Sequence, residues 1–405
     1  MITIETIPDE CKTEHLFLLI GSNPLPNYVA AMLLRRPNTV FYLIHTSSTF
    51  PIAEGLRNQL ADLGERHETS LLQVDATDSE SISNGIEAQL RKIPPRATIG
   101  LNYTGGTKAM AVHSYRILET KRGDTVFTYL DAQTLSLFIV GSNAQATRKV
   151  SVRQRCEIPL KTVMQLHGYT RYQSESAPNW NQTNRKKLVS TIAILTINPE
   201  SYKQWKEYTA QKPLDTLPDL NQWPALSPFV EQVRSICGAD ADTLQLSLFL
   251  EEGKKSSSCR TWLQGGWLEE YTIDAIDSVR KVCELTDLGM NLKPTKQGND
   301  NSFELDIAAM RGYQLLSLSC IVSDVKDSCQ EHFFEAYIRA RQFGGEEAHA
   351  ALICFYAKPA QLERTISENW LTQGHTKVFG REHLPNLPAH LKEWVQNIDA
   401  VANKR

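Results

Sequence analysis

Apolar and polar positions form two kinds of pattern along residues 15–140. Short apolar runs predict strands at 15–20, 39–45, 70–74, 97–102 and 125–130, with a further strand near 135–140. Between these runs the apolar residues recur at helical spacing, most clearly over 78–93, where Ile82, Ile86, Leu90 and Ile93 share one face. Strands that alternate with helices are typical of a parallel, doubly wound sheet covered by helices on both faces. The pattern therefore predicts an α/β fold for about the first 150 residues.

Three polar loops follow predicted strands of this sheet. They contain Gly21-Ser22-Asn23, Thr46-Ser47 and Thr104-Gly105-Gly106-Thr107-Lys108. Ligands of doubly wound sheets bind beyond the carboxyl ends of the strands, where glycines, hydroxyls and helix N-termini receive phosphates well. The glycine spacing excludes both the GxGxxG dinucleotide motif and the GxxxxGK[ST] phosphate loop. We expect a phosphate site of another kind; the alternative is that these loops only turn the chain.

The segments GSNPLPNYVAAMLL (21–34) and NYTGGTKAMA (102–111) resemble the two signature segments of the CARF domain, the CRISPR-associated Rossmann fold. The resemblance implies a Rossmann-like domain over residues 1–150 that senses a cyclic oligoadenylate, mainly cyclic tetraadenylate, across the twofold axis of a homodimer. It implies ligand contacts from Gly21, Ser22, Asn23, Thr46, Ser47, Thr104, Gly105, Gly106, Thr107 and Lys108. An alternative use of the same loops is cleavage of the bound ring near Thr107 and Lys108.

Length and charge define the rest of the chain. At 405 residues it is long enough for two or three domains, and its net charge is only −3. Residues 151–228 carry a net charge of +4, including Arg185-Lys186-Lys187, whereas residues 1–150 carry −1 and residues 229–405 carry −6. This balance excludes nucleic-acid binding through bulk charge. We expect residues 151–228 to form a helical connector, with a winged-helix nucleic-acid reader as the alternative.

The cysteines and the apolar runs predict where the protein resides. Eight cysteines are scattered singly, which is typical of reduced thiols and argues against a zinc site. No apolar run approaches the roughly 20 residues of a membrane span, and the start lacks the pattern of a signal peptide. We therefore expect a cytoplasmic protein that does not enter a membrane.

Residues 229–405 show the order helix, strand, strand, helix. A helix follows Gly265, strands are predicted at 303–308 and 314–322, and the next helix carries Phe333, Phe334, Tyr337 and Ile338 on one face. This is the core order of the PD-(D/E)xK, or restriction-endonuclease-like, α/β fold. The segments 265–270 (GGWLEE) and 334–345 (FEAYIRARQFGG) resemble the C-terminal half of CARF nucleases that cyclic tetraadenylate activates.

The resemblance implies a metal-dependent nuclease that cuts DNA or RNA. Its acidic positions correspond to Glu269 and Asp306, with Glu304 on the same strand face as Asp306, and the expected cofactor is Mg²⁺ or Mn²⁺. The next strand departs from the family pattern, because Ser319 and Ile321 stand where glutamate and lysine are expected. Two interpretations remain open. Lys326, with Glu331 or Glu335, replaces the missing groups, or the domain no longer cuts.

These features lead to two main hypotheses for function. The first is a dimeric sensor of a type III CRISPR antiviral response, in which cyclic tetraadenylate allosterically controls a nuclease with Glu269, Asp306 and Lys326 as catalytic residues. The second is a cyclic-oligoadenylate sensor with a degenerate nuclease domain that cuts nothing. The family resemblance favours the first hypothesis, and Ser319 and Ile321 favour the second.

Overall fold

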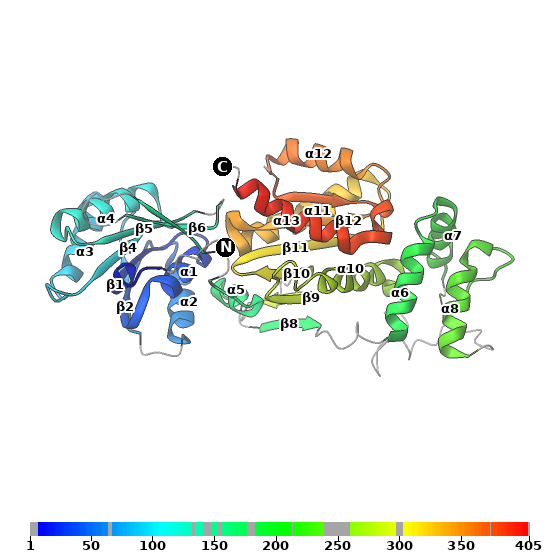
Figure 1. The fold of residues 1–405 in the computed structure, drawn as a ribbon, viewed down its shortest axis with the longest axis horizontal. Helices are drawn as coiled ribbons and strands as arrows, with labels where there is room; N and C mark the ends of the chain where they lie inside the picture. The colour runs from blue at the N-terminus through cyan, green and yellow to red at the C-terminus, as the bar shows by residue number, and fades with distance from the viewer. Residues whose placement is uncertain are drawn as a thin grey trace.

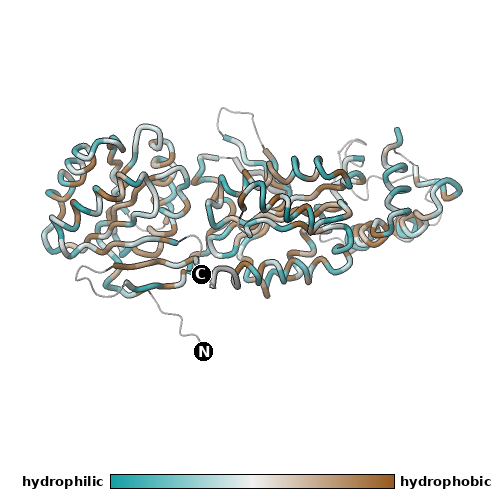
Figure 2. The backbone as a smooth tube through the Cα atoms, turned by 90° about the horizontal axis from the view of Figure 1, so that it is seen from above, coloured by the Kyte–Doolittle hydropathy of each residue, from teal (hydrophilic) through white to brown (hydrophobic). Residues whose placement is uncertain are grey.

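The protein is an elongated row of three parts (Figure 1). The computed structural model describes residues 7–403 except 64–66, 132–133, 141–146, 153–154, 170, 176–182, 213, 215, 239–259, 297–302 and 373. One sheet lies at the N-terminal end of the row, a second sheet lies in the middle, and a group of helices forms the other end. Figure 2 shows the same row from above, with hydrophobic stretches running through the strands of both sheets.

The first sheet has seven strands in the order β3-β2-β1-β4-β5-β6-β7. Its strands are β1 (Thr13–Leu19), β2 (Arg35–His45), β3 (Thr69–Gln73), β4 (Ile99–Asn102), β5 (Val126–Asp131), β6 (Ser136–Val140) and β7 (Arg148–Ser151). The strands from β3 to β5 are parallel, and β6 and β7 add an antiparallel edge. The intervening helices are α1 (Leu25–Leu34), α2 (Phe50–Ala61), α3 (Ser79–Leu90) and α4 (Lys108–Lys121). The predicted α/β fold is confirmed.

The strand order creates a switch point between β1 and β4. The chain leaves β1 toward β2 on one side, whereas β4 lies on the other side of β1. Loops that follow two such neighbouring strands diverge and leave a crevice at the carboxyl edge of the sheet. The Gly21 loop and the Gly105-Gly106 loop are the two loops at this edge.

The second sheet has six strands in the order β13-β12-β11-β10-β9-β8. They are β8 (Arg171–Glu175), β9 (Asp287–Thr295), β10 (Leu305–Arg311), β11 (Gln314–Ile321), β12 (His349–Cys354) and β13 (Thr376–Phe379). Its helices are α10 (Trp267–Ser278), which follows a π-helical turn at Trp262–Gly266, α11 (Lys326–Gly344), α12 (Pro359–Trp370) and α13 (Leu387–Asn403). The predicted order of helix, strand, strand, helix is present as α10, β10, β11 and α11, with β9 added before β10. The predicted loop at 298–302 lies outside the described residues.

The segment 151–228 is mainly helical and is divided between its neighbours. It holds α5 (Leu160–Leu166), α6 (Thr183–Leu195), α7 (Pro199–Thr209) and the start of α8 (Ser227–Cys237), and it also lends β8 to the edge of the second sheet. Trp205, Tyr208, Trp223 and Phe229 are buried together in the core that these helices share with α10. None of the helices in the described ranges is long and apolar enough to cross a membrane.

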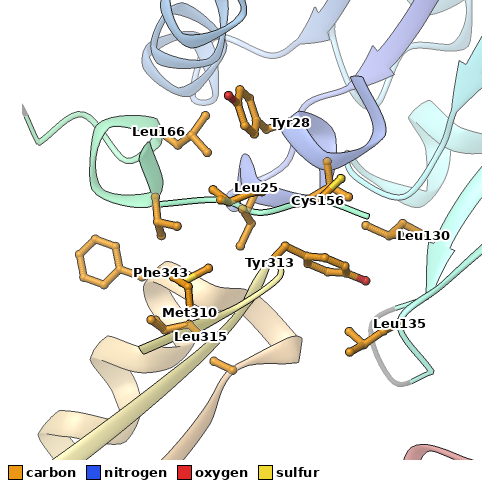
Figure 3. Close-up of a cluster of buried hydrophobic side chains, with 14 of the residues drawn as sticks. Leu25, Tyr28, Leu130, Leu135, Cys156, Leu166, Met310, Tyr313, Leu315 and Phe343 are labelled. Atoms are coloured by element: carbon orange, nitrogen blue, oxygen red, sulfur yellow. The ribbon is translucent and has the colours of Figure 1, made fainter. Parts of the chain in front are cut away.

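The two sheets share one hydrophobic core where they meet (Figure 3). Side chains of the first domain, such as Leu25 and Leu135, lie against Met310 and Tyr313 at the turn between β10 and β11. Leu166 of α5 and Phe343 of α11 belong to the same cluster. The two domains of one chain are therefore joined by continuous apolar packing.

Candidate functional site

The loops after β1 and β4 pack so closely that only glycine fits between them. A Cβ on Gly105 would lie 2.2 Å from the carbonyl oxygen of Leu19, and Gly106 has a φ of +73°. Other residue types avoid this left-handed backbone region and have no room here. The paired glycines thus bring the backbone of the second loop directly against the end of β1.

Hydrogen bonds fix the polar side chains of these loops. The Asn27 amide donates to the Leu19 carbonyl at 2.9 Å, and the Thr104 hydroxyl accepts from the backbone N–H of Leu130 at 2.7 Å. Thr107 is the N-cap of α4, where its hydroxyl accepts from the N–H of Met110 at 3.2 Å. The Asn23 side chain accepts from the N–H of Leu25 at 2.9 Å. The loops are therefore held in place by short-range contacts that need no ligand.

Two cavities open on either side of these loops. The larger, of about 700 Å³, lies toward the ends of β2 and β3 and is lined by Ile20, Gly21, Ser22, Thr46, Ser47, Ser48, Thr49, Gln73, Val74, Asp75, Ala76, Ser81, Gly106, Thr107 and Met110. Its lining is rich in hydroxyls and backbone groups and contains a single charged residue, Asp75. Neutral donors of this kind suit a ligand that carries several phosphates.

The second cavity, of about 520 Å³, lies between the two domains. It is lined by Gly21, Ser22, Asn23, Pro26, Thr104, Gly105, Gly106, Tyr129, Leu130, Arg341, Gly345, Glu346 and Glu347. Nine of the ten residues predicted to contact a ligand thus line one cavity or both. Lys108, the tenth, is exposed at the first residue of α4 and lines neither cavity. Arg341 and Glu347 come from the second domain, so no pattern in the first domain could have indicated them.

In the second domain, Asp306 and Ser319 lie side by side on β10 and β11. Ile307 pairs with Leu318 in the antiparallel ladder, which places Asp306 beside Ser319. The Ser319 hydroxyl and the Cys320 N–H both donate to Asp306 Oδ2, at 3.1 and 2.7 Å. Ser319 and Asp306 are therefore direct neighbours across the two strands.

His332 of α11 is the basic group nearest to Asp306 among the ion pairs of the described residues. Its Nε2 lies 3.5 Å from Asp306 Oδ2, and the hydrogen bond with this carboxylate raises the pKa of His332. Lys326 begins α11 and is partly buried, and no ion pair in the described part of the chain involves it. Sequence reasoning missed His332 because nothing in the helix pattern distinguishes it from a surface residue.

The three predicted metal-binding carboxylates do not form one group. Glu304 pairs with Lys293 of β9 at 3.1 Å. Asp306 and Glu269 both raise the pKa of the buried Cys320 thiol, in addition to the effect of burial itself, so both charges lie near this cysteine. Among the described residues, no three His, Cys, Asp or Glu side chains are placed to hold one metal ion. The arrangement offers two carboxylates and a serine hydroxyl.

Glu270, the neighbour of Glu269, forms an ion pair with the connecting segment. Its buried carboxylate accepts from the Arg185 guanidinium of α6, with Arg185 Nε 2.6 Å from Oε2, and from Trp262 Nε1 at 2.8 Å. Lys186 pairs with Asp274 one turn further along α10. Two of the three consecutive basic residues thus hold α6 to α10, and Lys187 alone of the three is exposed.

A family of known proteins matches the C-terminal part of the chain. Residues 256–398 match the sequence model of the family described as "Card1-like, endonuclease domain". The second domain thus resembles Card1-like endonucleases. No curated protein sequence matches the chain significantly.

Two solved structures share the fold over almost the whole chain. Protein VC1899 from Vibrio cholerae has a TM-score of 0.73 at 14% identity, and the alignment covers 95% of this chain and 98% of that one. Can2 from Sulfobacillus thermosulfidooxidans, solved in complex with cyclic tetra-adenylate, has a TM-score of 0.67 at 15% identity and covers 96% and 98%. The predicted α/β fold class is confirmed, and the likeness to Can2 and to Card1-like endonucleases agrees with the predicted resemblance.

Proposed function

We propose that the protein is a sensor of cyclic tetraadenylate in a type III CRISPR antiviral response, and that the ligand controls a nuclease activity of its second domain. The observation that carries the proposal is the meeting of the Gly21 loop with Gly105 and Gly106 at the switch point of the first sheet, with a cavity on each side. Can2, which has the same fold, was solved with cyclic tetra-adenylate.

The chemistry of the pocket supports a ligand with several phosphates. Ser22, Thr46, Ser47 and Thr107 offer hydroxyls, and α4 presents its N-terminal N–H groups beside them. We propose that two copies of the chain face each other as a homodimer, so that each copy supplies the same loops to one half of the ring. An isologous pair suits a ligand that has twofold symmetry itself.

We propose that the second domain hydrolyses phosphodiesters of DNA or RNA. Mg²⁺ in proteins keeps several waters and is commonly held by one or two carboxylates. We assign Asp306 and Glu269 as the carboxylates that would hold one such ion, with Mn²⁺ as the alternative. A bound ion of this kind would polarise the phosphate and activate water. The chain itself contributes the Ser319 hydroxyl and the Cys320 N–H, which orient the Asp306 carboxylate, and His332, which lies beside it.

One observation favours a second candidate, a sensor that does not cut. Ser319 stands beside Asp306 where the family pattern has a glutamate, and the described residues contain no group of three metal-ligating side chains. Lys326 remains the predicted replacement for the missing lysine. Ring cleavage by the first domain has less support, because Lys108 lines neither cavity.

Two measurements on the same preparation test the proposal. Calorimetric titration with cyclic tetraadenylate should show one ring bound per two chains. Cleavage of supercoiled DNA and single-stranded RNA, with Mg²⁺ or Mn²⁺, should depend on the ligand. Asp306→Asn should abolish the cleavage, whereas the matched variant Glu304→Gln should retain most of it because Glu304 is paired with Lys293 at the surface. Binding without cleavage would leave the non-cutting sensor, and absence of binding would refute both candidates.

A further inference from the structure

The cavity between the two domains has a wall that belongs to the second domain. This wall is the 3₁₀ turn Gly345–Glu347, which directly follows α11. This turn contacts the loop after β1: a Cβ added at Gly345 would lie 2.2 Å from Nδ2 of Asn23. Gly345 also has a φ of +71°, so both the backbone and the lack of space require glycine here. The turn is therefore fixed against the loop that follows β1.

Glu347 is the buried acid of this wall. Its residue is only 3% exposed, yet it lines the cavity together with Arg341 and Glu346. The pKa of Glu347 is raised to about 7, above all by burial and also by the nearby charges of Glu346 and Asp131, against the opposing effects of its own backbone N–H and of Arg341. The phenol of Tyr129, on β5, also lines the cavity, and burial and these acids raise its pKa above its ordinary value, so it is neutral here.

The charge state of Glu347 matters for any anion in this cavity. When it is ionised, it repels a phosphodiester on the opposite wall, and the two negative charges share a site from which water is partly excluded. When it is protonated, its carboxyl group is a hydrogen-bond donor for a phosphate or ribose oxygen. A bound polyanion would therefore favour the protonated form.

We propose that Glu347 is a ligand-binding residue contributed by the second domain, that it acts in its neutral form, and that binding of the phosphodiester ligand takes up a proton at this carboxyl group. The inference rests on the proposed function, since it assumes that the strand-end loops bind a cyclic oligoadenylate. It adds a recognition element from the nuclease-like domain to a site otherwise built by the first domain.

The experiment compares the affinity for cyclic tetraadenylate at pH 6 and pH 8. One ring would meet two Glu347 side chains, one from each copy of the chain. If only their neutral forms bind, the dissociation constant of the wild-type protein should rise by about a hundredfold between these values, about tenfold for each carboxyl group. Glu347→Gln mimics the neutral acid and should bind with nearly the same affinity at both. Glu346→Gln is the matched control. It removes the neighbouring exposed acid and should keep the pH dependence, with its midpoint moved to lower pH.

Calorimetry of the wild-type protein provides an independent readout. Titration at pH 7 in two buffers of different ionisation enthalpy should show uptake of about half a proton per chain, and Glu347→Gln should show none. A wild-type protein that takes up no proton, or a Glu347→Gln variant as pH-dependent as the wild type, would overturn the inference and leave the sensor intact. Failure of every variant to bind cyclic tetraadenylate at either pH would instead refute the proposed function.

Discussion

The loops after β1 and β4 in the first domain and the region around Asp306 in the second domain present different kinds of chemical group. In the larger cavity, beside Gly21 and Gly106, the groups are neutral apart from Asp75 and come mostly from the backbone and from hydroxyls. Around α10 and β10 the groups are charged, and each of Glu270 and Asp306 has hydrogen-bond donors beside it. A pocket of neutral donors receives a polyanion without first losing an internal ion pair. Buried charges, in contrast, require partners from distant parts of the chain.

The largest expected effect tests the charged groups around α10. Arg185→Ala should lower the free energy of unfolding by about 3–5 kcal/mol, because it leaves the buried Glu270 carboxylate without its cation. Denaturant titration measures the change. Lys186→Ala is the control on the same helix. Its pair with Asp274 is about one-third exposed, so its loss should cost about 1 kcal/mol or less. Equal losses would show that burial does not distinguish the two pairs.

A second prediction concerns how the stability of the fold depends on pH through buried residues at and just after the Gly345–Glu347 turn. Burial lowers the pKa of His349 to about 3 and raises that of Glu347 to about 7. Folding therefore favours the neutral form of both. Neutral His349 makes the fold less stable as pH falls from 6.5 to about 3, because the unfolded chain binds the proton that the folded one excludes. The contribution of Glu347 is complete below pH 4.5 and is lost as pH rises to about 7.

The two contributions to the free energy of unfolding change with pH in opposite directions, so they should cancel between pH 4.5 and 6.5. Glu347→Gln removes one of them. Its unfolding free energy, relative to the wild type, should therefore rise between pH 4.5 and 7, by a total on the order of 3 kcal/mol. Denaturant melts at several pH values measure the difference, in which the contributions of all unchanged groups cancel. A difference that does not vary with pH would mean that Glu347 titrates normally.

The loops after β1 and β4 depend on the close packing that their glycines allow. Gly105→Ala should weaken binding of cyclic tetraadenylate by about a hundredfold or more, because the added Cβ would lie 2.2 Å from the Leu19 carbonyl and must displace the loop. Gly123→Ala is the control in the same domain, where the nearest atom, the Glu119 carbonyl oxygen, is 3.9 Å away. Calorimetry measures both, with thermal melts to show that each variant is folded. Equal affinities for the two variants would show that the loop tolerates displacement.

The smallest effect tests whether the neutral pocket needs a cation. Lys108 is exposed and lines neither cavity, so Lys108→Ala should weaken binding by less than about tenfold. Because a screened, long-range attraction is involved, the loss should shrink as salt is added. Titrations at two ionic strengths measure this. A loss above tenfold that persists at high salt would establish the direct contact that the sequence predicts.

Features that repeat along a short stretch were predictable from the sequence. The alternation of strands and helices gave the first sheet, and the glycines marked the loops at its edge. The two-residue period of β11 also placed Ser319 beside Asp306, because side chains on one face of a strand are separated by two positions. In each case the information lies in the spacing of residues within single elements and the turns beside them.

Features that depend on contacts between distant segments were not predictable. β9 escaped notice because its sequence contains Pro294 and mixed polar residues, and its pairing with β10 and β8 defines it. His332 reaches Asp306 only because α11 packs on β11, and Glu347 enters the cavity beside the Gly21 loop only because the two domains meet. No local pattern specifies which helix face meets which strand.

The apolar cluster shared by the two domains has a practical consequence for anyone who divides the chain. A fragment that ends near residue 150 would expose Leu25, Tyr28 and Leu135 to water, and the remaining piece would expose Met310 and Tyr313. Exposed patches of this kind promote aggregation. Exchange of first domains between relatives would meet the same obstacle unless the apolar residues on both sides of the boundary were exchanged together. The two domains should therefore be expressed and engineered as one piece.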